Sequence, residues 1–302
     1  MTIQNAAVLV EFGVSQWNAK LVDKKIASKI AREYRAGDSA GTYHKSLLAG
    51  TTFHGQIARY AQAMRNYHSK NTLPWQDRGA RLLPIAMLQE YKAYMTGMTA
   101  QLESMIEEFT NDPSSRNFYL NQKEVAKQAT VALGEMYNEA DYPTLEEVRN
   151  DYAIRMSFLP LPTSGHFIVD AATPELEQLK AQYEELANKR VQGANESLWN
   201  RLLQRFEMAE QKIKSMDEYY TAKANGETGM GRVILQDDYL NEMRDLCHLL
   251  GKLNITGDDK LERARKSLLD AFDGLDGEDL KEDAGARQDV AEKLESIRKD
   301  FW

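Results

Sequence analysis

The chain has 302 residues, of which 42% are apolar and 28% are charged, and its formal net charge is −8. These proportions are typical of a globular protein with a real hydrophobic core, and they exclude a disordered chain. No apolar run approaches the roughly 18 residues that cross a bilayer, and residues 1–14 lack the basic start and cleavage site of a secretory signal. The single cysteine, Cys247, fits a reducing cytoplasm.

The charge is unevenly distributed along the chain. Residues 1–100 carry 13 lysines and arginines against 6 aspartates and glutamates, residues 101–200 carry 8 against 17, and residues 201–302 carry 17 against 23. The acidic total argues against a general nucleic-acid coat, but the basic first third leaves room for a local anionic contact. Alternatively, the basic third packs against the acidic remainder, in the same chain or in a neighbouring copy.

The first elements expected are a short strand over residues 7–14 and a basic helix within residues 18–37. Val22, Ile26 and Ile30 recur every four residues and predict a buried stripe on this helix. A helix face that only contacts solvent is one interpretation of the charges beside the stripe. The other is a contact with an anionic ligand such as a phosphate backbone, through Lys20, Lys24, Arg32 and Arg35.

Apolar residues spaced alternately by three and four predict helices over residues 53–67 and 88–109, each with one buried seam. The connector "KNTLPWQDRGARLLP" (70–84) contains two prolines, which end the first helix and begin the second. Its apolar residues predict an ordered corner, in which the tryptophan is buried and the aspartate pairs with one of the two arginines or caps a local turn. The same connector is a candidate partner contact, made by Trp75, Asp77, Arg78 and Arg81.

Residues 153–170 alternate apolar and polar side chains, turn and return, which predicts a small β-hairpin. A helix is then expected from Pro174 to about residue 222, with two heptad blocks that are out of phase across Gly193. Either the helix continues there and changes its packing partner, which we favour, or it bends. Residues 239–253 are also helical in pattern, and the acidic segment 273–302 is expected to be a linker with a loosely attached final helix.

Together these patterns predict a mainly α protein. We expect a long-helix bundle with coiled-coil-like seams, a small β-hairpin and a short N-terminal strand. The bundle is expected to form a single domain over residues 1–272, followed by the acidic segment.

The sequence contains no complete catalytic signature. His54 and His68 lie 14 residues apart on one expected helix, or about 21 Å along its axis, so they do not share a metal. The glycines of residues 226–232 lack the strand and helix context of a nucleotide loop, and the carboxylates near residues 270–279 lack the spacing of a calcium loop. We therefore expect no catalytic, cofactor-binding or metal-binding residue, and a protein that is not an enzyme.

Five segments differ from generic helical patterns: "AVLVEFGVSQWNAK", "YHKSLLAG", "NTLPWQDRGARLLP", "DYPTLEEVRNDYAIRMSFLPLP" and "HLLGKLNITGDDKLERAR". Together they resemble an uncharacterised family of helical proteins encoded by tailed phages and prophages. Some members are encoded near genes for a MoxR-like AAA+ ATPase and a von Willebrand A-type protein. The similarity covers most of residues 7–270. It implies a viral protein in the host cytoplasm during infection, and it transfers no catalytic residues.

Two functions from different classes follow. The first is a non-enzymatic protein that acts by protein–protein interaction, as an oligomeric scaffold or adaptor, with a role such as host takeover or anti-defence. Its partners would be further copies of the chain or phage or host proteins, because seams rich in Met and Tyr tolerate varied partners. The second is a nucleic-acid-associated accessory factor that uses the basic first third. A membrane partner is not expected.

Overall fold

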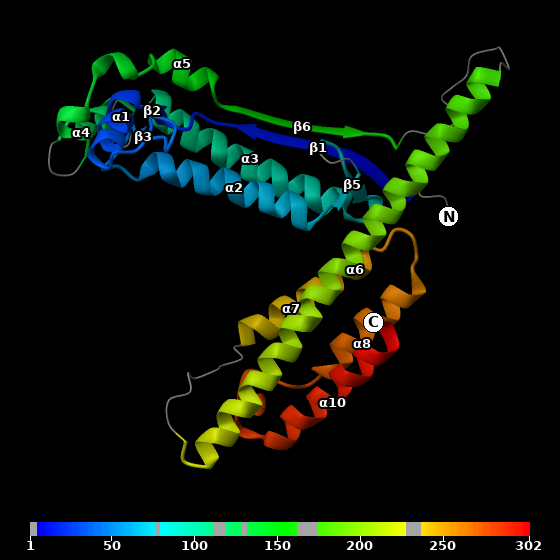
Figure 1. Cartoon of the computed structure of the whole chain (residues 1–302). Coiled ribbons are helices and arrows are strands. Elements are labelled where there is room, and N and C mark those ends of the chain that lie inside the picture. The colour runs from blue at the N-terminus through cyan, green and yellow to red at the C-terminus, as the bar shows by residue number, and fades with distance from the viewer. Residues whose placement is uncertain (1–4, 76–78, 112–118, 129–131, 162–173, 228–236) are drawn as a thin grey trace. The chain divides into compact units, whose positions relative to one another are not determined.

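The computed structural model of the chain describes residues 5–75, 79–111, 119–128, 132–161, 174–227 and 237–302, without the side chains of residues 111 and 174–176. Helices predominate, and a small antiparallel sheet accompanies them (Figure 1). The prediction of a mainly α protein is therefore confirmed.

The chain divides into two compact units, where the sequence pattern predicts one helical domain over residues 1–272. The first unit comprises Met1–Glu11, Lys70–Gln89 and Phe158–Trp302, and the second comprises Phe12–Ser69 and Glu90–Ser157. Apolar periodicity identifies helices but does not reveal which helices share a core. The division is therefore visible only in three dimensions.

The larger sheet has four strands in the order β4-β5-β1-β6. Their bounds are Leu73–Pro74 for β4, Arg81–Pro84 for β5, Ala7–Ser15 for β1 and Ala153–Leu159 for β6. The strands β1 and β6 match the predicted strand segments. The return half of the predicted hairpin, in residues 162–170, lies outside the described residues.

The corner between the two predicted helices contains two short strands that the sequence pattern missed. Leu73 lies opposite Leu82 across β4 and β5, and Ala7 lies opposite Pro84 across β5 and β1, in antiparallel register. Leu82 and Leu83 are completely buried. The two prolines end the strands, so this connector belongs to the sheet and the core of the first unit. A two-residue strand such as β4 is too short to produce a visible alternation.

The helices of the first unit pack around α6. Their bounds are Pro174–Ala224 for α6, Asp237–Leu253 for α7, Asp259–Ala271 for α8, Gly277–Glu282 for α9 and Ala284–Phe301 for α10. The helix α10 packs against α6 and α8 and buries Val290, Leu294 and Ile297 (Figure 1). The expected loose attachment of the final helix therefore differs from the structure. The acidic residues before α10 instead cap helices, since Asp276 and Asp283 accept hydrogen bonds at the starts of α9 and α10.

The long helix α6 continues through Gly193 without a break, which is the favoured alternative of the two. Its environment changes at that point. No side chain from residues 177 to 189 is buried, and Leu179 is 51% exposed, whereas Ala194, Leu198 and Leu202 begin a buried series.

In the second unit, α2 (Phe53–Lys70) and α3 (Leu88–Asn111) lie antiparallel. The ring of Phe53 at the start of α2 contacts Phe109 at the end of α3, with centroids 6.3 Å apart, and His68 Nδ1 lies 2.6 Å from the hydroxyl oxygen of Tyr91. Phe53, Tyr91 and Phe109, three residues of the predicted apolar spacing, therefore take part in contacts between the two helices.

The remainder of the second unit is built from short elements. They are β2 (Lys20–Val22), α1 (Lys24–Glu33), β3 (His44–Ser46), α4 (Tyr119–Ala126), the 3-10 turns η3 (Gly134–Met136) and η4 (Glu139–Asp141), and α5 (Leu145–Asn150). A third 3-10 turn, η2 (Ile85–Met87), belongs to the first unit and precedes α3. A capping box begins α5, because Thr144 and Glu147 each accept a hydrogen bond from the backbone N–H of the other.

Candidate functional site

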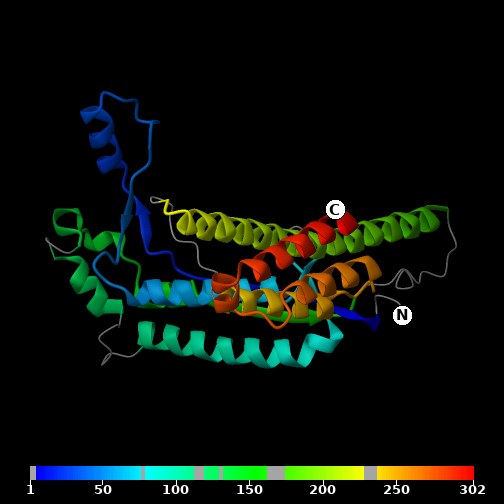
Figure 2. The ribbon, with the colours of Figure 1, turned by 90° about the horizontal axis from the view of Figure 1, so that it is seen from below.

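Residues 20–46 of the second unit form what we call the arm. It contains the antiparallel pair β2 and β3 with the helix α1 between them, and Lys20 lies opposite Ser46 in the register. Within this unit the arm stands out from the paired helices α2 and α3 (Figure 2). It holds the four basic residues that the sequence indicates for an anionic contact.

Local hydrogen bonds define the ends of α1. The carboxylate of Asp23 accepts a hydrogen bond from the backbone N–H of Ile26 at 3.0 Å and so caps the first turn. At the other end Arg35 has a φ of 51°, a left-handed conformation that stops the helix. A helix of 10 residues is too short to be stable in isolation, so it depends on these caps and on the strands beside it.

The apolar stripe of α1 is exposed, which corrects the prediction that it is buried. No residue of α1 is buried, Ile30 is 42% exposed, and the neighbouring Val22 and Tyr34 are 45% and 77% exposed. Helical spacing shows that a helix has an apolar face, but it does not show that the same chain covers that face. Exposed apolar surface in a defined element is a typical mark of an interaction site.

A groove of about 260 Å³ runs between α1 and the loop that returns to β3. Its lining consists mostly of small and aromatic side chains, including Ala27, Ile30, Tyr34, Ala40 and Tyr43. An apolar side chain of a partner fits such a groove better than a sugar or phosphate does, because the lining residues contain few polar groups.

The arm also carries exposed cations. Lys20, Lys24, Arg32 and Arg35, the candidate contacts for an anionic ligand, are all exposed on the arm. Lys25 and Lys29 are exposed as well, so the arm combines an apolar groove with exposed positive charge. This combination favours a partner with an apolar anchor and acidic surroundings.

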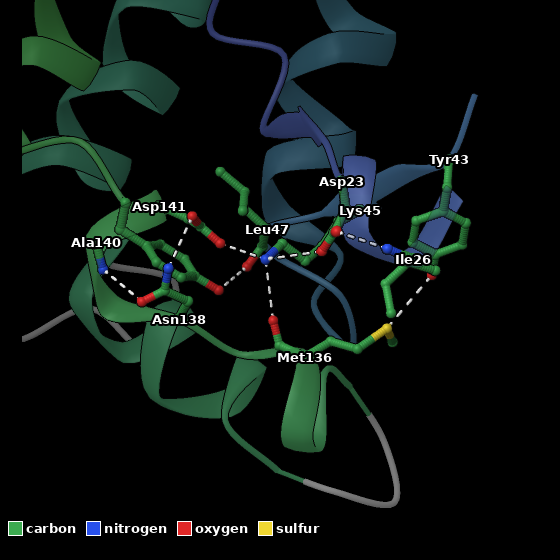
Figure 3. Close-up of polar contacts among 10 residues, drawn as sticks. Asp23, Ile26, Tyr43, Lys45, Leu47, Met136, Asn138, Ala140 and Asp141 are labelled. Carbon is green, nitrogen blue, oxygen red and sulfur yellow. Dashed lines mark hydrogen bonds and ion pairs between the residues drawn. The ribbon is translucent and has the colours of Figure 1, made fainter. Parts of the chain in front are cut away.

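A buried ionic cluster fixes the base of the arm (Figure 3). The side chain of Lys45 in β3 is only 4% exposed, and its ammonium group donates a hydrogen bond to the backbone oxygen of Met136 at 3.0 Å. It also forms ion pairs with the carboxylates of Asp141 and, at 3.8 Å, Asp23. Because Asp23 also caps α1, the cluster connects the helix to the 3-10 turns η3 and η4.

Two tyrosines strengthen this connection. The hydroxyl of Tyr142 donates a hydrogen bond to the backbone oxygen of Leu47 at 2.5 Å, and burial raises the pKa of Tyr142 above its usual range. The hydroxyl of Tyr43 contacts the sulfur of Met136 at 3.7 Å. These contacts hold the base of the arm while its apolar face stays accessible.

The sequence pattern missed the anchor. Lys45 lies 96 residues before Asp141, and a three-residue strand has no local signal that separates a buried lysine from an exposed one. Only the three-dimensional structure brings these charges together.

The second candidate site is the corner at residues 70–84, and its four candidate residues have different outcomes. Trp75 is buried, as predicted, and the guanidinium group of Arg190 lies over its ring at 5.4 Å. Arg81 donates hydrogen bonds to the hydroxyl and backbone oxygens of Thr72, at 2.7 and 3.1 Å. The pairing expected for Asp77 and Arg78 lies outside the described residues.

A further arginine binds the same corner. Arg201 of α6 donates hydrogen bonds to the backbone oxygens of Lys70 and Thr72, at 2.9 and 2.8 Å. Burial, with a smaller contribution from the charge of Arg81, lowers the pKa of Arg201 to about 10. Trp75 and Arg81 thus take part in the internal packing of the first unit, which favours the structural corner over a partner contact.

The groups with catalytic potential are used structurally. Burial raises the pKa of the Cys247 thiol to about 11, so the reactive thiolate is disfavoured. His54 Nε2 lies 2.8 Å from the backbone oxygen of Trp17. Among the residues that the structure describes, no group of three or more His, Cys, Asp or Glu side chains is arranged to hold a metal ion.

Comparisons with protein-family models, curated proteins and solved structures return no match for this chain. Within the described part of the chain, no helix combines the length and the apolar character that crossing a membrane requires.

Proposed function

We propose that this chain is a non-enzymatic protein that acts by protein–protein interaction and that the arm is its binding element. The observation that carries the proposal is the exposed apolar stripe of α1, held on a buried ionic anchor. A buried anchor beneath an exposed apolar surface gives a rigid, preformed binding element, which lowers the entropy lost on binding.

A protein partner explains the arm better than nucleic acid does. Phosphate contacts require cations, which the arm has, but they do not require an apolar groove. A partner helix with an apolar anchor residue and acidic neighbours uses both features. Nucleic acid remains the second candidate because Lys20, Lys24, Arg32 and Arg35 are all exposed.

The setting of this function rests on the sequence resemblance. We also propose that the chain is an oligomeric scaffold or adaptor. In this proposal it is encoded by a phage and acts in the host cytoplasm, in host takeover or anti-defence. The proposal also includes the idea that the exposed leucines Leu179 and Leu186 of α6 form a coiled-coil-like seam with a partner helix.

Affinity purification of the tagged chain from infected cells, followed by native mass spectrometry, tests the proposal. The double variant Ile30→Glu, Tyr34→Glu places charges on the apolar stripe and is expected to lose the partner. Leu120→Glu is the matched control, because it changes an exposed apolar residue of α4, outside the arm and outside the proposed seam of α6. If the arm variant retains every partner of the wild type, the arm is not the binding element.

Fluorescence anisotropy with labelled duplex DNA and single-stranded RNA tests the second candidate. A nucleic-acid function predicts binding at low salt that weakens steeply as the salt concentration rises, and a further loss in the variant Lys24→Glu, Arg32→Glu. Absence of binding at low salt excludes it.

A further inference from the structure

We infer that the partner of the arm is a second copy of this chain, and that α1 of one copy docks in the groove between α6 and α10 of the next. This inference rests on the proposed function of the arm and names its partner. Its support is a second surface on the chain whose shape and charge complement the arm.

The second surface is a groove of about 980 Å³ between α6 and α10 of the first unit. The two helices lie side by side (Figures 1 and 2). Ile213 and Leu294 are among its lining residues and are almost completely buried, whereas Ala284 and Ala291 on α10 are exposed. Ala284 and Ala291 leave space beside α10, where the backbone of a short helix such as α1 can approach.

The charges of this groove have the sign opposite to those of the arm. Five carboxylates line it against three cations, and the cations Lys214, Arg287 and Arg298 already form ion pairs within it. Glu207 and Glu295 account for the excess of carboxylates in the lining, and Glu295 forms an ion pair with Lys299, which is not a lining residue. The helix α1 carries four cations and a single carboxylate, Glu33.

Complementary charge selects one orientation and one partner. An arm that approaches another arm brings like charges together, and two acidic grooves likewise repel. The interface is therefore heterologous and uses a different surface on each copy. Such an interface leaves a free arm at one end and a free groove at the other, so the copies add head to tail and association rises with concentration.

Analytical ultracentrifugation of the full chain over a range of concentrations tests the inference. The wild type is expected to exceed the mass of one copy as concentration rises, and less so at high salt. The arm variant Ile30→Glu, Tyr34→Glu and the groove variant Ala291→Arg are each expected to stay at the mass of one copy. Ala291 is exposed and arginine is a good helix former, so this change is expected to leave α10 intact.

Mixing the two variants gives the decisive result. The arm variant keeps an intact groove and the groove variant keeps an intact arm, so an equimolar mixture is expected to form a dimer, with one copy of each and twice the mass of either alone. A mixture that stays at the mass of one copy overturns the pairing of arm and groove. Circular dichroism of each variant confirms that loss of association is not loss of folding.

The wild type separates failure of this inference from failure of the proposed function. The inference is overturned if the wild type has the mass of one copy at every concentration. This result would also be seen if α1 docked within its own chain, and that case too contradicts the inference. If the arm variant still loses another protein in the affinity purification, the arm binds that protein and the proposed function stands. If the arm variant loses no partner in either experiment, both fail.

Discussion

The ammonium group of Lys45 forms an ion pair with the carboxylate of Asp141, 96 residues further along the chain. The lysine lies at the base of a projecting arm, and the aspartate lies in a 3-10 turn that no apolar pattern predicts. This pair, with the Asp23 carboxylate beside it, determines where the exposed helix α1 is held.

We expect Lys45→Met to destabilise the second unit by about 3–5 kcal/mol, because it leaves the two carboxylates without their buried cation. Amide hydrogen exchange along the chain measures the change, and the loss of protection is expected to centre on residues 20–46. Lys127→Met is the control, because its ion pair with Glu124 is exposed and its loss is expected to change stability little. If Lys45→Met lowers the free energy of unfolding by less than about 1 kcal/mol, Lys45 does not anchor the arm.

Trp75→Ala is expected to lower the free energy of unfolding of the first unit by about 3–5 kcal/mol, since the indole ring is buried beneath Arg190. Chemical denaturation followed by circular dichroism measures this loss. Tyr34→Ala removes an aromatic ring that is 77% exposed, and its effect is expected to stay within about 0.5 kcal/mol. An intact fold in Trp75→Ala, together with a lost partner, would instead make the corner a binding site.

Replacement by alanine is expected to change stability in opposite directions at Gly193, near the middle of α6, and at Gly226, just after the end of α6. A Cβ at Gly193 meets nothing within 4 Å inside the helix, so Gly193→Ala is expected to stabilise α6 by about 0.5–1 kcal/mol. Gly226 also has open space, but its φ is +78°, and Gly226→Ala is expected to cost about 1 kcal/mol. Thermal melts of both variants measure the signs, and melting temperatures that shift in the same direction would contradict the assignment.

His54 is expected to make the second unit less stable in mild acid. Burial, opposed by the hydrogen bond to Trp17, lowers the pKa of His54 from its ordinary value of 6.5. As the pH falls below about 6.5, the unfolded chain binds a proton that the folded chain resists, so stability is lost down to the lowered pKa. The loss between pH 7.5 and pH 5.5, from urea denaturation, is expected to be smaller in His54→Gln. An equal loss in both proteins would show that other groups cause it.

Most helices were predictable because their signals are local. Three-and-four spacing predicts α2, α3, the second half of α6 and α7. The short strands β2 to β5 were not predictable, because two to four residues are too few to show a period. The division into two units also escaped prediction, since it depends on which seams meet.

The candidate site was half predictable. The composition of the sequence predicts the basic residues of the arm, and these residues are exposed in the structure. The sequence also indicates the apolar stripe, but it assigns Ile30 to the core, because spacing cannot identify what covers a face. The Lys45 anchor and the α6–α10 groove depend on residues that are distant in sequence, and a single sequence carries no signal for such pairs.

The discontinuous composition of the first unit has a consequence for synthesis on the ribosome. The second unit is complete once Ser157 has been made, but the first must wait for the whole stretch from Phe158 to Trp302. At about 5–20 residues per second, that wait is on the order of ten seconds. During this interval the paired strands β1 and β5 lack α6 and α7, although Leu82 and Leu83 of β5 are buried in the complete chain. The nascent chain therefore presents a complete arm and an uncovered sheet before the groove between α6 and α10 exists.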